Sequence, residues 1–417
     1  MTSDFIRRAG FTLGALLIYR LGCNIPLPGI NFDLIEKMLQ APPAAGLKGM
    51  LLSTGGLSHL AIFALGITPY VSAAVLLQLA GIIFRRLRRL QSDGERGRQT
   101  LRRLTFGVTI VLAAFQSYGI AVALEGINGA VINPGGLYLL STAATLTAGT
   151  VFLGWLSEQM TAFGLGNGIA LILLAGTTLA LSDPIVTITE LNTRGLLTSN
   201  TLLSLIGLLV FTVGAIVAVE RARRRFPIEY SPRQIGDRLL ENLSANLEIK
   251  LNPAGIIPVI LASWLLGMAI LILGFTTDTD LIIKYLAPGR PAYLALHAVL
   301  IFICAVFYAA YVFNPEQAAE DLRKRSGVIR SVAPGEATVA YLDAAVSRIV
   351  LFGATYLVVI CLLPDVLRFY FHVPVYLGGV PLLILICTIL DFDHQIRGYF
   401  GWAHRRAEPS AAQPAEY

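Results

Sequence analysis

Long runs without charged residues recur along the whole chain, and they constrain its fold more than any other feature. Eight runs contain no Lys, Arg, Asp or Glu: Gly49–Phe84, Leu104–Leu124, Gly126–Ser157, Gln159–Ser182, Gly195–Val219, Leu251–Thr277, Pro291–Pro315 and Phe369–Leu390. Each reaches the roughly 20 residues that a helix needs to cross a hydrocarbon core of about 30 Å. Two weaker runs, Phe5–Ile25 and Asp343–Leu363, are interrupted by arginines. The sequence therefore predicts an all-α membrane protein with ten transmembrane helices.

The basic residues fix the expected orientation. Ten spans place both termini on one side, together with the connections Arg85–Arg103, Met160–Asn167, Glu220–Lys250 and Phe313–Tyr341. We assign 25 of the 32 Lys and Arg residues to that side or next to it. Because cytoplasmic segments carry the excess of Lys and Arg, both termini are predicted to lie in the cytoplasm.

A short internal repeat indicates how the spans are organised. The segment that begins at Gly66 matches the one that begins at Gly255 at Gly, Ile, Pro, Ala and two final leucines, with an offset of 189 residues. The two segments occupy the second and seventh spans, and five spans per half make the halves run in opposite directions. Inverted repeats of this kind meet around a central pathway, with Gly and Pro breaking a helix beside it. The alternative is a chance match, since Gly and Pro are frequent in membrane helices.

The run Gly49–Phe84 is too long for one straight span. Its first part contains the pair Gly55-Gly56 and several hydroxyl side chains. Broken backbone at membrane depth is tolerated where it is buried in protein or lines a cavity, so we expect a half-helix inside the bundle that acts as a stopper. An ordinary extracytoplasmic loop explains the pattern equally well.

No pattern of a catalytic or metal site emerges. HExxH and Walker motifs are absent from the sequence, and the four cysteines are widely spaced in or beside apolar runs. We expect no cofactor, no metal and no enzymatic activity. A secondary transporter with inverted repeats is the alternative from another class, but it should carry an ionisable residue at mid-membrane. The long runs lack acids, and Asp391 and Asp393 fall near a cytoplasmic end, so an apolar pathway is the better interpretation.

Many short motifs, in order from end to end, resemble the SecY family. They are Arg20-Leu-Gly, Ile25-Pro-Leu-Pro-Gly-Ile30, Ile62 to Ile67 with Pro69-Tyr70, Gln78-Leu79, Gly97-Arg98, Gln116-Ser117, Trp155 to Gly168 with Glu158-Gln159, Asn252 to Ile260, Phe313-Asn-Pro315, Ser326-Gly327, Pro334-Gly-Glu336, Gly378-Gly379 and Asp391-Phe392. Each motif alone is weak, but their order and spacing together are specific.

The resemblance implies a protein-conducting channel with two inverted five-helix halves around a central pore. The N-terminal half is expected to span 1–182, with a plug at about 47–58. The C-terminal half would span 183–396, with cytoplasmic loops 220–250 and 313–341, and a cytoplasmic tail would follow at 397–417. Such a channel conducts unfolded polypeptides across the bacterial inner membrane and releases hydrophobic segments sideways into lipid.

By motif position, the resemblance also assigns pore and gate residues. The pore ring is expected at Ile67, Val71, Ile169, Leu173, Ile260 and Ile384, the plug at Leu51, Leu52, Ser53, Gly55 and Gly56, and the lateral gate at Thr68 and Gln116. An aliphatic constriction dewets and blocks ions, yet admits an extended chain of any sequence. Read without the family, the ring residues are ordinary core or lipid-facing side chains, and Thr68 and Gln116 simply bond neighbouring helices.

The basic loops are the expected docking surface. The residues assigned to motor or ribosome docking are Arg223, Arg224, Arg225, Arg323, Lys324, Arg325 and Arg330. The expected partners are SecE-like and SecG-like subunits, the SecA motor ATPase, the ribosome, preproteins with signal sequences and membrane lipids. Topogenesis and attraction to anionic lipid would explain the same charges without a protein partner.

One departure from the family pattern concerns the motor. Ala333 precedes Pro334-Gly335-Glu336, where the family usually has an arginine that serves transport by SecA. Arg330 is the nearest substitute. An accessory channel with restricted clients is therefore an alternative to the main channel of the cell.

Overall fold

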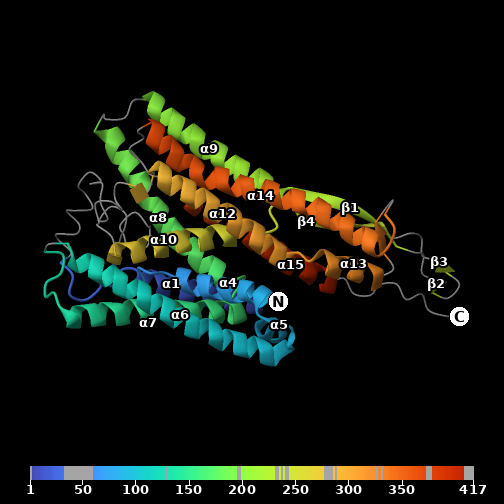
Figure 1. The fold of residues 1–417 in the computed structure, drawn as a ribbon, viewed down its shortest axis with the longest axis horizontal. Coiled ribbons are helices and arrows are strands. Elements are labelled where there is room, and N and C mark those ends of the chain that lie inside the picture. Colours follow the sequence, from blue (N-terminus) through green and yellow to red (C-terminus); the bar gives the residue numbers. More distant parts are fainter. Residues whose placement is uncertain are drawn as a thin grey trace. The chain divides into compact units, whose positions relative to one another are not determined.

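The computed structural model describes most of the chain. The described residues are 2–31, 60–127, 129–194, 199–230, 234–235, 238–239, 244–276, 285–286, 289–324, 327–329, 332–371 and 378–407. They form mainly helices, with short strands in one part of the chain (Figure 1). The chain groups into two compact units.

The first unit combines three stretches of the chain, Met1–Ala73, Arg103–Thr187 and Ile384–Tyr417. Its helices are α1 (Thr2–Gly22), the first turns of α4 (Thr68–Ile83), most of α6 (Gly94–Glu125), α7 (Gly136–Phe163), most of α8 (Gly168–Thr193) and most of α15 (Gly379–Ala407). A buried cluster joins the segments that follow α1 and α6 to the start of α7, and it includes Leu27, Leu60, Leu124 and Tyr138. Isolated bridges pair Pro26 with Ala61 and Ile30 with Val131 in the same region.

The second unit contains Ala74–Arg102 and Ile188–Leu383. Its helices are the rest of α4, α5 (Arg85–Ser92), the start of α6, α9 (Ser199–Arg221), α10 (Ile257–Thr276), α12 (Pro291–Val312), α13 (Pro315–Lys324) and α14 (Glu336–Phe371). Its strands are β1 (Arg223–Tyr230), β2 (Gln234–Ile235), β3 (Arg238–Leu239), β4 (Ser244–Lys250) and β5 (Gly327–Ile329). Helix α12 lies against both α10 and α14.

An antiparallel sheet in the order β4-β1-β5 joins two of the basic segments, with Phe226 opposite Leu247 and Ile228 opposite Ile329. Along β1, Phe226 and Ile228 are buried, whereas the residues between and beside them are exposed. The buried side chains of the sheet pack against the first turns of α14 through two small cores. The strands thus form a small sheet that packs on the start of α14.

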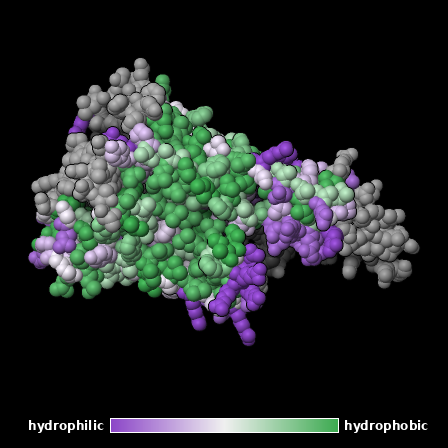
Figure 2. Space-filling model, in the orientation of Figure 1, coloured by the Kyte–Doolittle hydropathy of each residue, from purple (hydrophilic) through white to green (hydrophobic). Residues whose placement is uncertain are grey.

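Seven helices of the described part are long and apolar enough to cross a membrane, namely α6, α7, α9, α10, α12, α14 and α15. The pair α4 and α5, bent by 116°, makes eight if it is counted as one span, and α8 adds the shorter apolar stretch Gly168–Thr178. Exposed apolar side chains such as Leu203 (71% exposed) and Phe211 (66% exposed) on α9 suit a lipid environment. Figure 2 shows hydrophobic residues over much of the visible helical surface. These features support a multi-pass membrane protein, and the total of ten spans stays a prediction.

The expected cytoplasmic connections contain more regular structure than the charge pattern indicated. The segment Arg85–Arg103 forms α5 and the start of α6, and Phe313–Tyr341 contains α13, β5 and the start of α14. Helix α7 continues through Met160 to Phe163. A helix can continue beyond the hydrocarbon core of the membrane, because its backbone hydrogen bonds do not depend on whether its side chains are charged.

Candidate functional site

The two copies of the internal repeat fold into the same turn. Gly66 and Gly255 both have φ of +63°, and an apolar helix begins two residues later in each case, α4 at Thr68 and α10 at Ile257. Left-handed backbone is costly for any residue with a Cβ, which explains glycine at both positions. A proline then occupies the first helical turn, where its missing N–H is tolerated. Both repeats therefore begin a helix with the same turn, and in the described residues Gly66 and Gly255 precede a helix rather than interrupt one.

The turn before α10 is held by side chains. Asn252, which is 2% exposed, donates from Nδ2 to Glu220 Oε1 at 2.8 Å and to the Gly255 carbonyl oxygen at 3.2 Å. The Gly255 N–H donates back to Asn252 Oδ1 at 3.2 Å. The end of α9 is thereby tied to the start of α10.

The candidate ring residues lie at or near helix starts. Ile67 (2% exposed) directly precedes α4, Val71 lies in its first turn, and Ile260 lies in the first turn of α10. Ile169 and Leu173 are half-buried and one turn apart at the start of α8, and Ile384 is buried near the start of α15. Their arrangement around a pore stays a prediction.

Helix α4 is joined to α7 by a partly buried hydrogen bond. The Tyr70 hydroxyl donates to Glu158 Oε1 at 3.0 Å, across 88 residues of sequence. One turn before Glu158, a Cβ at Gly154 would lie 2.9 Å from Cδ2 of the Tyr70 ring. The absent side chain at Gly154 lets the ring lie directly against α7.

The gate candidates are less clearly connected. Thr68 is the first residue of α4 and Gln116 lies on α6, and both are half-buried. Oε1 of Gln116 is buried without a hydrogen-bond partner among the described residues. The hydroxyl oxygens of the neighbouring Ser117 and of Thr147 on α7 lie 3.4 Å apart, so polar side chains do meet between α6 and α7 here.

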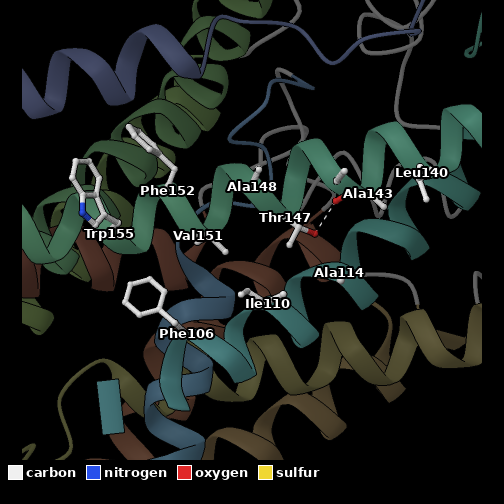
Figure 3. Close-up of a pocket in the computed structure, with 11 residues that line it drawn as sticks. Phe106, Ile110, Ala114, Leu140, Ala143, Thr147, Ala148, Val151, Phe152 and Trp155 are labelled. Carbon is white, nitrogen blue, oxygen red and sulfur yellow. Dashed lines mark hydrogen bonds between the residues drawn. The ribbon is translucent and has the colours of Figure 1, made fainter. Parts of the chain in front are cut away.

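Beside this link, α6 and α7 form an open apolar groove (Figure 3). It has a volume of about 810 Å³ and is lined by Phe106, Ile110, Ala114, Leu140, Ala143, Ala144, Thr147, Ala148, Val151, Phe152 and Trp155. The Thr147 hydroxyl donates to the Ala143 carbonyl oxygen at 2.7 Å and so presents little polarity to the groove. The surface suits apolar contact rather than recognition of a polar ligand.

The docking candidates on β1 are exposed and engaged with their own sheet. Arg223 and Arg225 form ion pairs with Glu248 of β4 at 3.2 and 3.0 Å, and Arg224 lies 5.4 Å from the centre of the Phe226 ring. Hydrophilic residues gather over β1, α13 and α5 in Figure 2. The sheet therefore presents these guanidinium groups in a fixed array.

The candidates of the second basic segment are only partly described. Arg323 and Lys324 are exposed at the end of α13, where Lys324 pairs with Glu320 at 3.3 Å. Arg325, Arg330 and all plug candidates at 47–58 lie outside the described residues. Ala333 is exposed, and its carbonyl oxygen accepts from Thr338 Oγ1 at 2.8 Å at the start of α14.

Two polar features of the spanning helices were not predicted. One is the contact between Tyr70 and Glu158. The other lies in the second unit, where the buried His297 of α12 shares a hydrogen bond with Ser263 of α10 at 3.1 Å. Asp365 of α14 is also buried, with 6% of its surface exposed. It falls just outside the predicted run Asp343–Leu363.

The comparisons with known proteins agree with this architecture. The SecY family profile matches residues 61–392. The chain is 40% identical to protein translocase subunit SecY of Escherichia coli K12 over 94% of this chain and 90% of that protein. It is 35% identical to the corresponding protein of Buchnera aphidicola subsp. Schizaphis graminum, over 95% of this chain and 93% of that protein.

Solved structures show the same fold. One described as a protein conducting channel has a TM-score of 0.68 at 17% identity, covering 98% of this chain and 95% of its own. Sec61 in a canine ribosome-channel complex has a TM-score of 0.65 at 17% identity, with the same coverage. With its family profile, its close curated relatives and its fold in agreement, the chain belongs to the SecY family.

Proposed function

We propose that the chain is the pore-forming subunit of a bacterial preprotein translocase. It conducts unfolded polypeptides across the inner membrane and releases hydrophobic segments sideways into lipid. The observation that carries the proposal is the repeated turn at Gly66 and Gly255, which starts α4 and α10 with buried aliphatic side chains. Gly and Pro at equivalent places of two repeats mark a central pathway.

The chemistry of the proposed constriction fits a channel for chains of any sequence. Ile67, Val71, Ile169, Leu173, Ile260 and Ile384 carry no polar group that could bind one substrate. A narrow aliphatic passage excludes water and ions at rest. An entering polypeptide therefore has no tightly bound water or ion to displace. Residues 47–58 would close the outer side.

The energy for movement comes, in this proposal, from partners. The exposed arginines of β1 and the basic end of α13 suit acidic protein surfaces or phosphate groups. We assign them to a SecA-type motor and to the ribosome, with SecE-like and SecG-like subunits completing the complex. Both termini would lie in the cytoplasm.

The experiment that tests the proposal is reconstitution. The purified chain with SecE-like and SecG-like subunits in liposomes should move a preprotein into a protease-protected space when SecA and ATP are supplied. Omission of ATP is the control. Failure to move preprotein, together with saturable uptake of a small solute, would replace the channel with the transporter alternative.

A further inference from the structure

Glu158 is an ionisable residue directly after the uncharged run Gly126–Ser157, on a helix long and apolar enough to cross a membrane. It lies on α7, one turn before the helix ends at Phe163, and it is half-buried. An acid in such a place is costly unless it is paired, and it marks a functional contact whose partner should be named. Here a named partner is Tyr70, whose hydroxyl donates to Oε1 at 3.0 Å.

The tyrosine that makes this contact is closely held. Tyr70 is 6% exposed, its ring lies 5.4 Å from the Phe106 ring of α6, and its Cδ2 lies against the backbone of Gly154. Gly154 and Glu158 are four residues apart and so share one face of α7. The Tyr70 ring therefore packs against both α6 and α7, and the Glu158 side chain accepts a hydrogen bond from the hydroxyl at the end of that ring.

Tyr70 lies in the same turn of the chain as two of the candidate ring residues. The residue lies three positions after Ile67 and one before Val71, both ring candidates. At 100° per residue, Tyr70 points about 60° away from Ile67 and about 100° away from Val71 around the helix. One side of this turn is thus anchored to α7, while the adjacent side carries the aliphatic residues.

We propose that the hydrogen bond from Tyr70 to Glu158 positions the first turn of α4, and through it sets the closure of the aliphatic constriction. This inference rests on the proposed function, because it assigns Ile67 and Val71 to the pore. Tyr70 and Glu158 are positioning residues that touch no substrate. When the bond is lost, the turn is free to shift, and the resting channel passes ions.

The test measures ion conductance of the resting, reconstituted complex in planar bilayers. Tyr70→Phe removes only the hydroxyl, and Glu158→Met removes the acceptor at nearly constant length. Each should raise resting conductance about tenfold, since a hydrogen bond that joins α4 to α7 is lost. Glu158→Gln keeps a side-chain oxygen that can accept, and it should leak several-fold less than Glu158→Met.

A coupling measurement separates positioning from general damage. The double variant Tyr70→Phe with Glu158→Met should leak no more than the worse single variant, because both changes break one bond. Tyr138→Phe is the matched control, since this buried tyrosine lies on α7 about 30 Å along the helix from Glu158. Thermal unfolding of each variant is measured alongside conductance.

The outcomes distinguish this inference from the function on which it rests. If the parent complex transports preprotein and Ile67→Asn leaks, but Tyr70→Phe and Glu158→Met stay closed, the positioning role is wrong and the channel stands. Additive leaks in the double variant, or equal leaks from Glu158→Gln and Glu158→Met, also overturn it. If the parent complex fails to transport, the proposed function itself fails.

Discussion

Substitution of Gly255 by alanine isolates the cost of the turn that begins α10. Its φ of +63° disfavours any side chain, yet no described heavy atom lies within 4 Å of the place where a Cβ would stand. The change therefore tests backbone conformation without steric overlap. A residue with a Cβ in left-handed conformation costs roughly 1–2 kcal/mol, so Gly255→Ala should lower the free energy of unfolding by about that amount.

Gly267 provides a control of opposite sign on the same helix. It lies inside α10, and a Cβ there also meets no described atom within 4 Å. Alanine in a helix interior is favoured over glycine by about 0.5–1 kcal/mol, so Gly267→Ala should stabilise the protein. The two variants should differ by roughly 1.5–3 kcal/mol.

Equilibrium unfolding in mixed micelles, with the SDS fraction raised and helicity followed by circular dichroism, measures this difference. Gly66→Ala should repeat the loss at Gly255, because Gly66 has the same φ and the same open surroundings. A Gly255→Ala protein as stable as the parent would refute the claim that the turn demands glycine. Parallel loss of stability in Gly267→Ala would show that added volume, not backbone strain, is the cause.

Three further predictions concern the seal, the packing and the docking surface. Ile67→Asn and Ile260→Asn should each raise the ion conductance of the resting channel, and unchanged conductance removes that residue from the ring. Gly168→Ala should sharply reduce the yield of folded protein, because its Cβ would overlap the carbonyl oxygen of Ser157; normal expression and unfolding would contradict this. Arg224→Glu should weaken binding of SecA or ribosomes, most strongly at low salt where exposed charges are least screened, whereas salt-independent binding would exclude an electrostatic role.

The sequence predicted the helices well where one physical rule dominates. Uncharged runs indicate segments that cross the hydrocarbon core of a membrane, and all eight runs overlap helices of the structure. The glycine turns were also visible, because Gly-Ile-x-Pro carries a conformational requirement within four residues. Helix ends were less accurate: α6 begins at Gly94, ten residues before the run Leu104–Leu124, since charge marks the membrane boundary and not the end of a helix.

The sheet and the buried polar contacts escaped prediction for different reasons. In β1 the alternation of Phe226 and Ile228 with exposed residues is a strand signal that the charge of the segment obscured. The hydrogen bond between Tyr70 and Glu158 joins residues that are 88 apart, and no local pattern encodes that distance. Family motifs mark both positions without stating that they meet.

The sheet β4-β1-β5 also has a mechanical consequence. Strand β1 follows α9 almost directly, β4 leads into the turn before α10, and β5 precedes α14. The helices α9, α10 and α14 are thus connected to one hydrogen-bonded sheet. The buried side chains around Phe226 and Ile228 pack that sheet against α14. Because hydrogen bonds join β1 to both β4 and β5, we expect the three strands to move together as one body. A displacement of β1 would then be passed to the ends of α9, α10 and α14.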